Sequence, residues 1–119
     1  MVNIDIDNLT NDSKFLLSSL YKRYIVQRKN NIDKQKAIYF DNSDKIKEQI
    51  MPEWSTSDVF SCIRELSTNG FITCTYLSNK AFDVRLTDKS ISVFEHKFKN
   101  NLSSLIEFIS TIKSLIPFI

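Results

Sequence analysis

The sequence predicts an α+β fold, in which helices precede and follow one β-hairpin. Three observations lead to this prediction. Apolar residues recur at helical spacing as far as residue 66, and two runs of alternating polar and apolar residues follow between residues 72 and 86. Gly70, the single glycine among 119 residues, lies between the two patterns. A helix commonly ends in a left-handed residue, which is usually glycine because a Cβ would clash there, so we expect a tight corner at Gly70.

The first half of the chain predicts two helices and a short strand. The first helix is expected over about residues 11–29, with Thr10 or Asn11 as its N-cap. The short apolar run at 37–40 is followed by turn-forming residues and is interpreted as a small strand. A second helix is expected to begin at 42–44 and to continue to about residue 50, because Pro52 prevents its continuation.

A third helix is expected from Ser55 to about Ser67. The residues at 55–58 are typical of a capping box, in which Ser55 accepts a bond from the Asp58 amide while the Asp58 carboxylate bonds back. At 100° per residue the apolar residues around Ile63 share one face, with Glu65 beside the opposite one. That opposite, polar face contains Ser57, Ser61, Arg64 and Thr68.

After Gly70, the sequence predicts a hairpin and two more helices. Ile72, Cys74 and Tyr76 alternate with threonines, residues 78–80 form the turn, and Phe82, Val84 and Leu86 alternate with Asp83 and Arg85 on the return strand. Thr87 is expected to cap the next helix. The last segment repeats apolar residues at steps of three and four, as in a heptad seam. Its members are Leu102, Leu105, Ile109, Ile112, Ile116 and, beyond Pro117, Ile119.

Three interpretations of this apolar last helix remain open: packing against its own domain, homodimerisation, and, less favoured, contact with a membrane surface. A spanning helix needs about 20 mostly apolar residues, and the serines in this segment argue against one. We therefore divide the chain into a tail at 1–9, a domain at 10–98 and an apolar helix at 99–119, which would serve dimerisation or self-packing.

The order helix, strand, helix, helix, hairpin, helix is that of a winged helix-turn-helix domain. RELSTNGFI at 64–72 resembles the segment that leaves the recognition helix in such proteins, and RLTDKS at 85–90 resembles the start of the helix after the wing, with Ser90 where that pattern usually has glycine. Similar segments occur in PadR- and MarR-type regulators and in small YjcQ-like proteins of Gram-positive bacteria and phages. The resemblance covers roughly residues 10–98.

The resemblance implies a small homodimeric transcriptional regulator that binds double-stranded DNA. It implies that the polar face of the third helix, with Ser57, Ser61, Arg64 and Thr68, enters the major groove. It also implies that Lys80 at the tip of the wing and Arg85 on its outer face contact the backbone. Leu102, Leu105, Ile109, Ile112 and Ile116 would form the dimer contact. Hydroxyl and guanidinium groups suit base edges and phosphates.

The distribution of charge favours a different class of function. Residues 37–65 contain three bases and six acids, whereas residues 14–36 contain seven bases and one acid. Phosphate neutralisation supplies most non-specific DNA affinity, so an acidic recognition region counts against DNA binding. The basic run from Lys22 to Lys36 would suit flanking phosphates or an acidic partner. The alternative is therefore a winged-helix protein–protein interaction module of phage or mobile-element origin that does not bind DNA.

The sequence argues against an enzyme, a metal site and a cofactor. One histidine and two cysteines cannot supply a structural zinc set, and a single glycine leaves no phosphate-cradling loop. The first residues are acidic and lack the basic and apolar regions of a signal peptide, so we expect a cytoplasmic protein.

Overall fold

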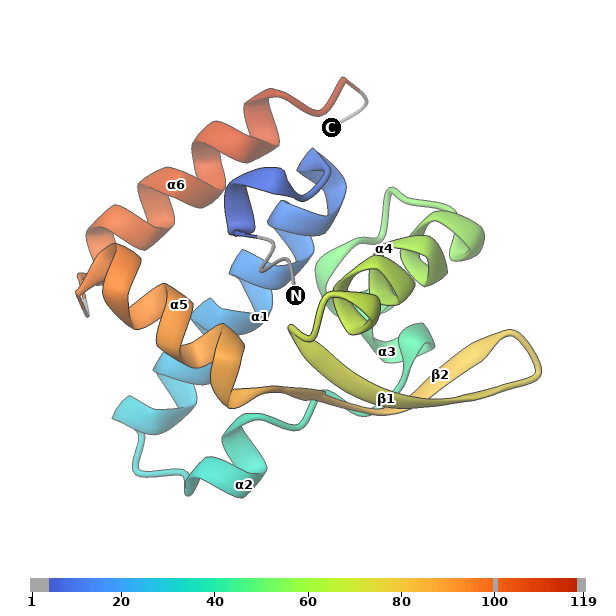
Figure 1. Cartoon of the computed structure of the whole chain (residues 1–119), viewed down its shortest axis with the longest axis horizontal. Helices are drawn as coiled ribbons and strands as arrows, with labels where there is room; N and C mark the ends of the chain where they lie inside the picture. Colours follow the sequence, from blue (N-terminus) through green and yellow to red (C-terminus); the bar gives the residue numbers. More distant parts are fainter. Residues whose placement is uncertain (1–4, 100, 118–119) are drawn as a thin grey trace.

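The structure is a computed structural model that describes residues 5–99 and 101–117 (Figure 1). In this part of the chain it is α+β, with six α-helices, one 3-10 turn and one two-stranded antiparallel sheet. The elements are η1 (Ile6–Asn8), α1 (Asn11–Lys29), α2 (Lys34–Ala37), α3 (Ser43–Ile50), α4 (Thr56–Thr68), β1 (Ile72–Leu77), β2 (Lys80–Leu86), α5 (Asp88–Phe98) and α6 (Leu102–Ser114).

The helix starts follow the caps that the sequence predicts. Thr10, Ser55 and Thr87 each accept a hydrogen bond from a backbone N–H three residues on, and Asn42 does the same for α3. The capping box at α4 forms only in part. Asp58 N–H donates to Ser55 Oγ at 3.0 Å, but within the described residues the Asp58 carboxylate makes no return bond.

The strand expected at 37–40 does not form. Asp33 caps a short helix, α2, by accepting a bond from Lys36 N–H, and this helix takes in Ala37. The next residues run along β2 as an edge segment, with Tyr39 in an isolated antiparallel bridge to Arg85. Because Ala37 belongs to α2, only residues 38–40 of the apolar run remain to pair with β2. They form an isolated bridge and not a strand.

The corner after α4 forms at Gly70, as expected. Gly70 has a φ of +78°. Its N–H donates to Ser67 O at 3.1 Å, and Phe71 N–H donates to Leu66 O at 2.9 Å. These two bonds form a Schellman motif, which satisfies the last carbonyls of α4 and turns the chain directly into β1.

The hairpin differs from the expected alternation because β2 contains a bulge. Its two-residue turn, Ser78 and Asn79, has positive φ at both positions, which suits the twist of a hairpin. Asp83 also has a positive φ, and the pairing shifts between Thr73 and Thr75. Between these pairs β2 has one residue more than β1. This extra residue reverses which side chains of β2 face the core. Ala81 is therefore buried with Val84 and Leu86, whereas Phe82, expected on their face, is only half-buried.

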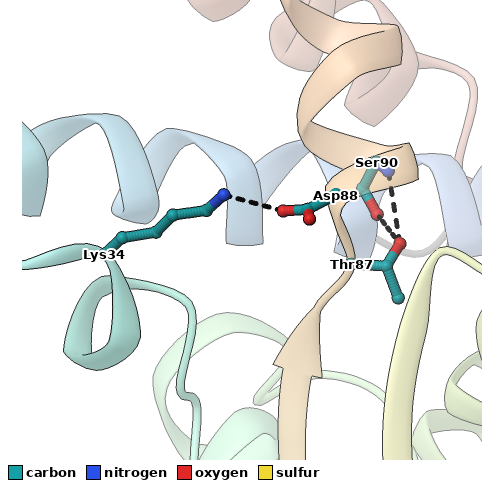
Figure 2. Close-up of polar contacts among 4 residues, drawn as sticks. All are labelled: Lys34, Thr87, Asp88 and Ser90. Atoms are coloured by element: carbon teal, nitrogen blue, oxygen red, sulfur yellow. Dashed lines mark hydrogen bonds and ion pairs between the residues drawn. The ribbon is translucent and has the colours of Figure 1, made fainter.

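The start of α5 is hydrogen-bonded to the corner at Gly70. Thr87 Oγ1 donates to Gly70 O at 2.7 Å, and Ser90 Oγ donates to Phe71 O. Figure 2 shows Thr87 and Ser90 bonded to each other at the start of α5, with Lys34 of α2 paired to Asp88 beside them. The two segments that carry the resemblance are thus in direct contact, and the hydroxyl of Ser90 forms part of it.

One hydrophobic core runs through the described residues, with α1 at its centre. Figure 1 shows α6 lying along α1, on the side away from α4 and the hairpin. Ile6 and Leu9, within the expected tail, are buried in this core. Of the expected dimer seam, Leu105, Ile112 and Ile116 are buried and Leu102 and Ile109 are half-buried, while Ile119 lies outside the described residues. In this chain the seam packs against its own domain.

Candidate functional site

The outward face of α4 presents the four polar residues that the sequence selects. Ser57, Ser61, Arg64 and Thr68 are all exposed, and they follow one another at steps of four, three and four along the helix. The α3 helix packs against α4, and β1 follows directly from its end. This places the face beside the hairpin, free of cover by other described elements.

Arg64 is held in place by two aromatic rings. Its guanidinium carbon lies 5.4 Å from the ring centroid of Tyr76 in β1 and 5.8 Å from that of Phe60 in α4. The two rings meet edge to face at 5.6 Å, and the Tyr76 hydroxyl is 2.5 Å from Ser67 Oγ. Stacking on aromatic faces restricts a long side chain while its N–H groups stay available. Arg64 is therefore a preorganised donor group.

The two cations of the hairpin are engaged by other residues. Lys80 Nζ pairs with Asp44 Oδ2 of α3 at 2.8 Å, and both side chains remain about half exposed. Arg85 lies with its guanidinium carbon 4.8 Å from the Tyr39 ring centroid. The Ile72–Leu86 pair is buried, so the neighbouring Thr73–Arg85 pair faces the other side of the sheet. The structure thus separates Arg85 from Arg64.

Glu65 is directed away from the outward face. Its carboxylate accepts bonds from Ser13 Oγ at 2.6 Å, Thr10 Oγ1 at 2.8 Å and Thr10 N–H at 3.0 Å. Burial acts to raise the pKa of this carboxyl group, but the bonds from Ser13 and Thr10 outweigh it and lower the pKa. One acid that the sequence sets beside the polar face of α4 is thus bound to the N-terminus of α1.

A basic groove, which sequence reasoning missed, lies between α1, α2, α3 and α6. Its volume is about 1120 Å³. It is lined by five cations from four helices and by one acid, Asp41; the cations are Lys22, Arg23, Lys36, Lys45 and Lys113. The basic run in the sequence supplies three of them. Lys45 and Lys113 come from α3 and α6, and no local pattern connects them to that run.

The described residues contain no group of three or more histidine, cysteine or carboxylate side chains that could hold a metal ion. Cys62 is buried, and burial is the main cause that raises the pKa of its thiol to about 12. A thiol that stays protonated is a poor nucleophile and a poor metal ligand.

In the part of the chain that the structure describes, no helix combines the length and apolar character needed to cross a membrane. Comparison with family models, curated proteins and solved structures gives no match to this chain.

Proposed function

We propose that this protein is a winged-helix DNA-binding protein that acts as a small transcriptional regulator, with α4 as its recognition helix and the β1–β2 hairpin as its wing. The observation that carries the proposal is the exposed polar face of α4, with Arg64 fixed at its centre by a ring of the hairpin. Support comes from the α3–α4 pair, the corner at Gly70 and the hairpin followed by α5, although α2 and an isolated bridge at Tyr39 stand where this class has a short strand.

The chemistry of the face suits a major groove. A helix fits into that groove, and arginine can donate two bonds to the O6 and N7 atoms of guanine. Ser57, Ser61 and Thr68 supply hydroxyl groups on both sides of Arg64, which suit phosphates and base edges. The wing would contribute Lys80, provided that an incoming phosphate replaces Asp44 as its partner.

The electrostatic objection raised by the sequence is weaker in the folded chain. Glu65 points to Thr10 and Ser13, and Asp44 is balanced by Lys80. The recognition face therefore presents fewer free negative charges than the composition of residues 37–65 indicates. Sequence preference would depend on Arg64 more than on net charge.

The proposal is tested by fluorescence anisotropy with labelled random-sequence duplex DNA over a salt series. We expect binding at low ionic strength that weakens steadily with salt, because phosphate contacts release counterions. Arg64→Ala should weaken binding by about tenfold, as expected for the loss of a charged contact. Lys113→Ala removes the same charge from α6 and serves as the matched control. Absence of binding at low salt, or an equal effect of the two variants, would contradict the proposal.

The second candidate function is the interaction module that does not bind DNA. The observation that favours it is the engagement of Lys80 by Asp44, which leaves the wing without a free cation at its tip. A protein that shows no DNA affinity at low salt, yet retains its fold, would support this candidate. The sequence leaves both homodimerisation and self-packing open for the last helix. The burial of Leu105, Ile112 and Ile116 within one chain favours self-packing, and light scattering of the purified chain tests it.

A further inference from the structure

We propose that the basic groove between α1, α2, α3 and α6 binds an acidic amphipathic helix of a partner protein. None of the six DNA-contact residues predicted from the sequence lines the groove, although Arg85 stacks on Tyr39, one of its lining residues. The inference therefore goes beyond DNA binding and does not depend on it.

The cations of the groove lack carboxylate partners. Within the described residues, Lys22, Lys36, Lys45 and Lys113 form no ion pair, and Arg23 donates only to Gln49, at 3.0 and 3.1 Å. The three lysines that pair with an aspartate in the described part of the chain, Lys34, Lys80 and Lys97, all lie outside the groove. Five cations facing one hollow, with Asp41 as its only acid, favour an anionic occupant.

The groove also exposes apolar surface between these cations. Six large apolar side chains are exposed in the described part of the chain, and three of them, Val26, Tyr39 and Ile106, line this groove. They are 41%, 38% and 44% exposed. Half-buried Phe40, Ile50 and Ile109 add to the lining. Apolar surface gathered in one hollow and rimmed by charges is typical of a protein-binding site.

The dimensions suit a helix. The lining residues of α1 run from Phe15 to Gln27, which corresponds to about 18 Å of helix axis, or roughly three turns. The volume exceeds the range of about 300–1000 Å³ usual for small-molecule pockets. An amphipathic helix placed in such a groove buries its apolar face against the lining and presents its charges to the rim. Glutamates at the edges of that face would meet the lysines.

A nucleic-acid occupant is less well matched. A phosphate backbone needs cations and hydrogen-bond donors but gains nothing from Val26 and Ile106. A partner helix uses both the cations and the apolar floor. The combination of the two surfaces therefore decides in favour of an acidic protein segment.

The test uses a fluorescein-labelled synthetic helical peptide of about 14 residues, or roughly four turns, with leucines on one face and glutamates on the other. Anisotropy with the full chain should give a dissociation constant in the micromolar range, about 8 kcal/mol of binding free energy. A scrambled peptide of the same composition should bind much more weakly. Lack of binding of the amphipathic peptide by the folded chain would overturn the proposal.

Charge reversal in the groove tests whether the peptide binds at this site. The double variant with Lys22→Glu and Lys113→Glu should weaken peptide binding by about tenfold or more, because attractive contacts become repulsive. It should also gain affinity for a peptide with lysine in place of glutamate. The double variant with Lys29→Glu and Lys99→Glu carries the same charge change outside the groove and should bind the original peptide nearly as well as the parent.

A second variant tests the apolar surface of the groove and leaves its charges unchanged. Ile106→Gln removes apolar surface from an exposed position and should weaken peptide binding while the melting temperature changes little. Random duplex DNA should not displace the peptide. If duplex DNA does displace it, and the variant with Lys22→Glu and Lys113→Glu loses DNA affinity while Arg64→Ala retains it, the groove is a nucleic-acid site and the proposal is wrong.

Discussion

Glu65 of α4 accepts two hydrogen bonds from Thr10, the N-cap of α1, one from its backbone N–H at 3.0 Å and one from its hydroxyl at 2.8 Å. Thr10 in turn accepts the bond from Ser13 N–H that caps α1. A carboxylate near a helix N-terminus is also favoured by the helix dipole. This contact therefore joins the proposed recognition helix to the central helix of the core.

Replacing this carboxylate should destabilise the protein. Glu65→Gln removes the charge and half of the acceptor capacity, so we expect the free energy of unfolding to fall by about 1–3 kcal/mol. Glu48→Gln, at an exposed position of α3, is the matched control and should change the stability little. Urea unfolding at neutral pH measures both values.

The same contact predicts an acid sensitivity. The folded-state pKa of Glu65 lies below its ordinary value of 4.5, so its stabilising contribution is complete above that pH and is lost as the pH falls through the folded pKa. In Glu65→Gln the unfolding free energy should therefore depend less on pH below 4.5 than in the parent. A parallel dependence in the two proteins would contradict the role assigned to the contact.

Gly70→Ala should destabilise the corner through its backbone conformation. An added Cβ would lie 3.7 Å from Lys89 atoms, which is an ordinary contact, so the cost arises from the positive φ alone. We expect about 1–2 kcal/mol from chemical denaturation. Gly70→Asn should cost less, because asparagine tolerates this conformation better. Equal costs would indicate a steric cause instead.

Tyr21→Phe should stabilise the protein. The Tyr21 hydroxyl is buried and has no hydrogen-bond partner among the described residues, so its removal should raise the unfolding free energy by about 1 kcal/mol. Burial is the main cause that raises the pKa of Tyr21 from 10.0 to about 12. The unfolded chain therefore loses this proton first, and parent stability should fall as the pH rises from 10 towards 12. That fall should be smaller in Tyr21→Phe.

Asp44→Asn should strengthen DNA binding if the hairpin acts as a wing. The change frees Lys80 and removes a negative charge beside it, so affinity for duplex DNA should rise several-fold and the salt dependence should steepen. Stability should change by less than about 1 kcal/mol, because exposed pairs contribute little. Asp88→Asn, which frees Lys34 on another surface, is the control and should leave DNA affinity nearly unchanged.

Ile112→Ala should lower stability within a single chain. Ile112 is 5% exposed, and its truncation should cost about 2–4 kcal/mol. Because it packs against its own domain, the unfolding midpoint should not depend on protein concentration. Ile106→Ala, at an exposed position of the same helix, should cost much less. A midpoint that rises with concentration would instead support the dimer predicted from the sequence.

The parts of the fold that the sequence predicts well are set by local chemistry. Thr10, Ser55 and Thr87 cap the helices that begin after them, and Gly70 provides the one corner where a glycine is needed. Each signal acts over a few residues. Such signals can be recognised without knowledge of the tertiary structure.

The features that sequence reasoning missed depend on contacts between distant segments. Asp83 adopts a positive φ without being glycine, so nothing in the alternation reveals the bulge. The direction of the Glu65 side chain depends on where α1 begins in space. The groove combines Lys113 with Lys22, and only the packing of α6 on α1 brings these two lysines to the same hollow.

The continuous core makes the two ends of the described chain depend on each other. Ile6 near the start and Ile116 near the end are both buried in it, together with the apolar side of α1. A fragment trimmed to residues 10–98 would expose the apolar side of α1 to water. Trimming at either end is therefore expected to cause aggregation or partial melting, and chain folding should occur as one cooperative event.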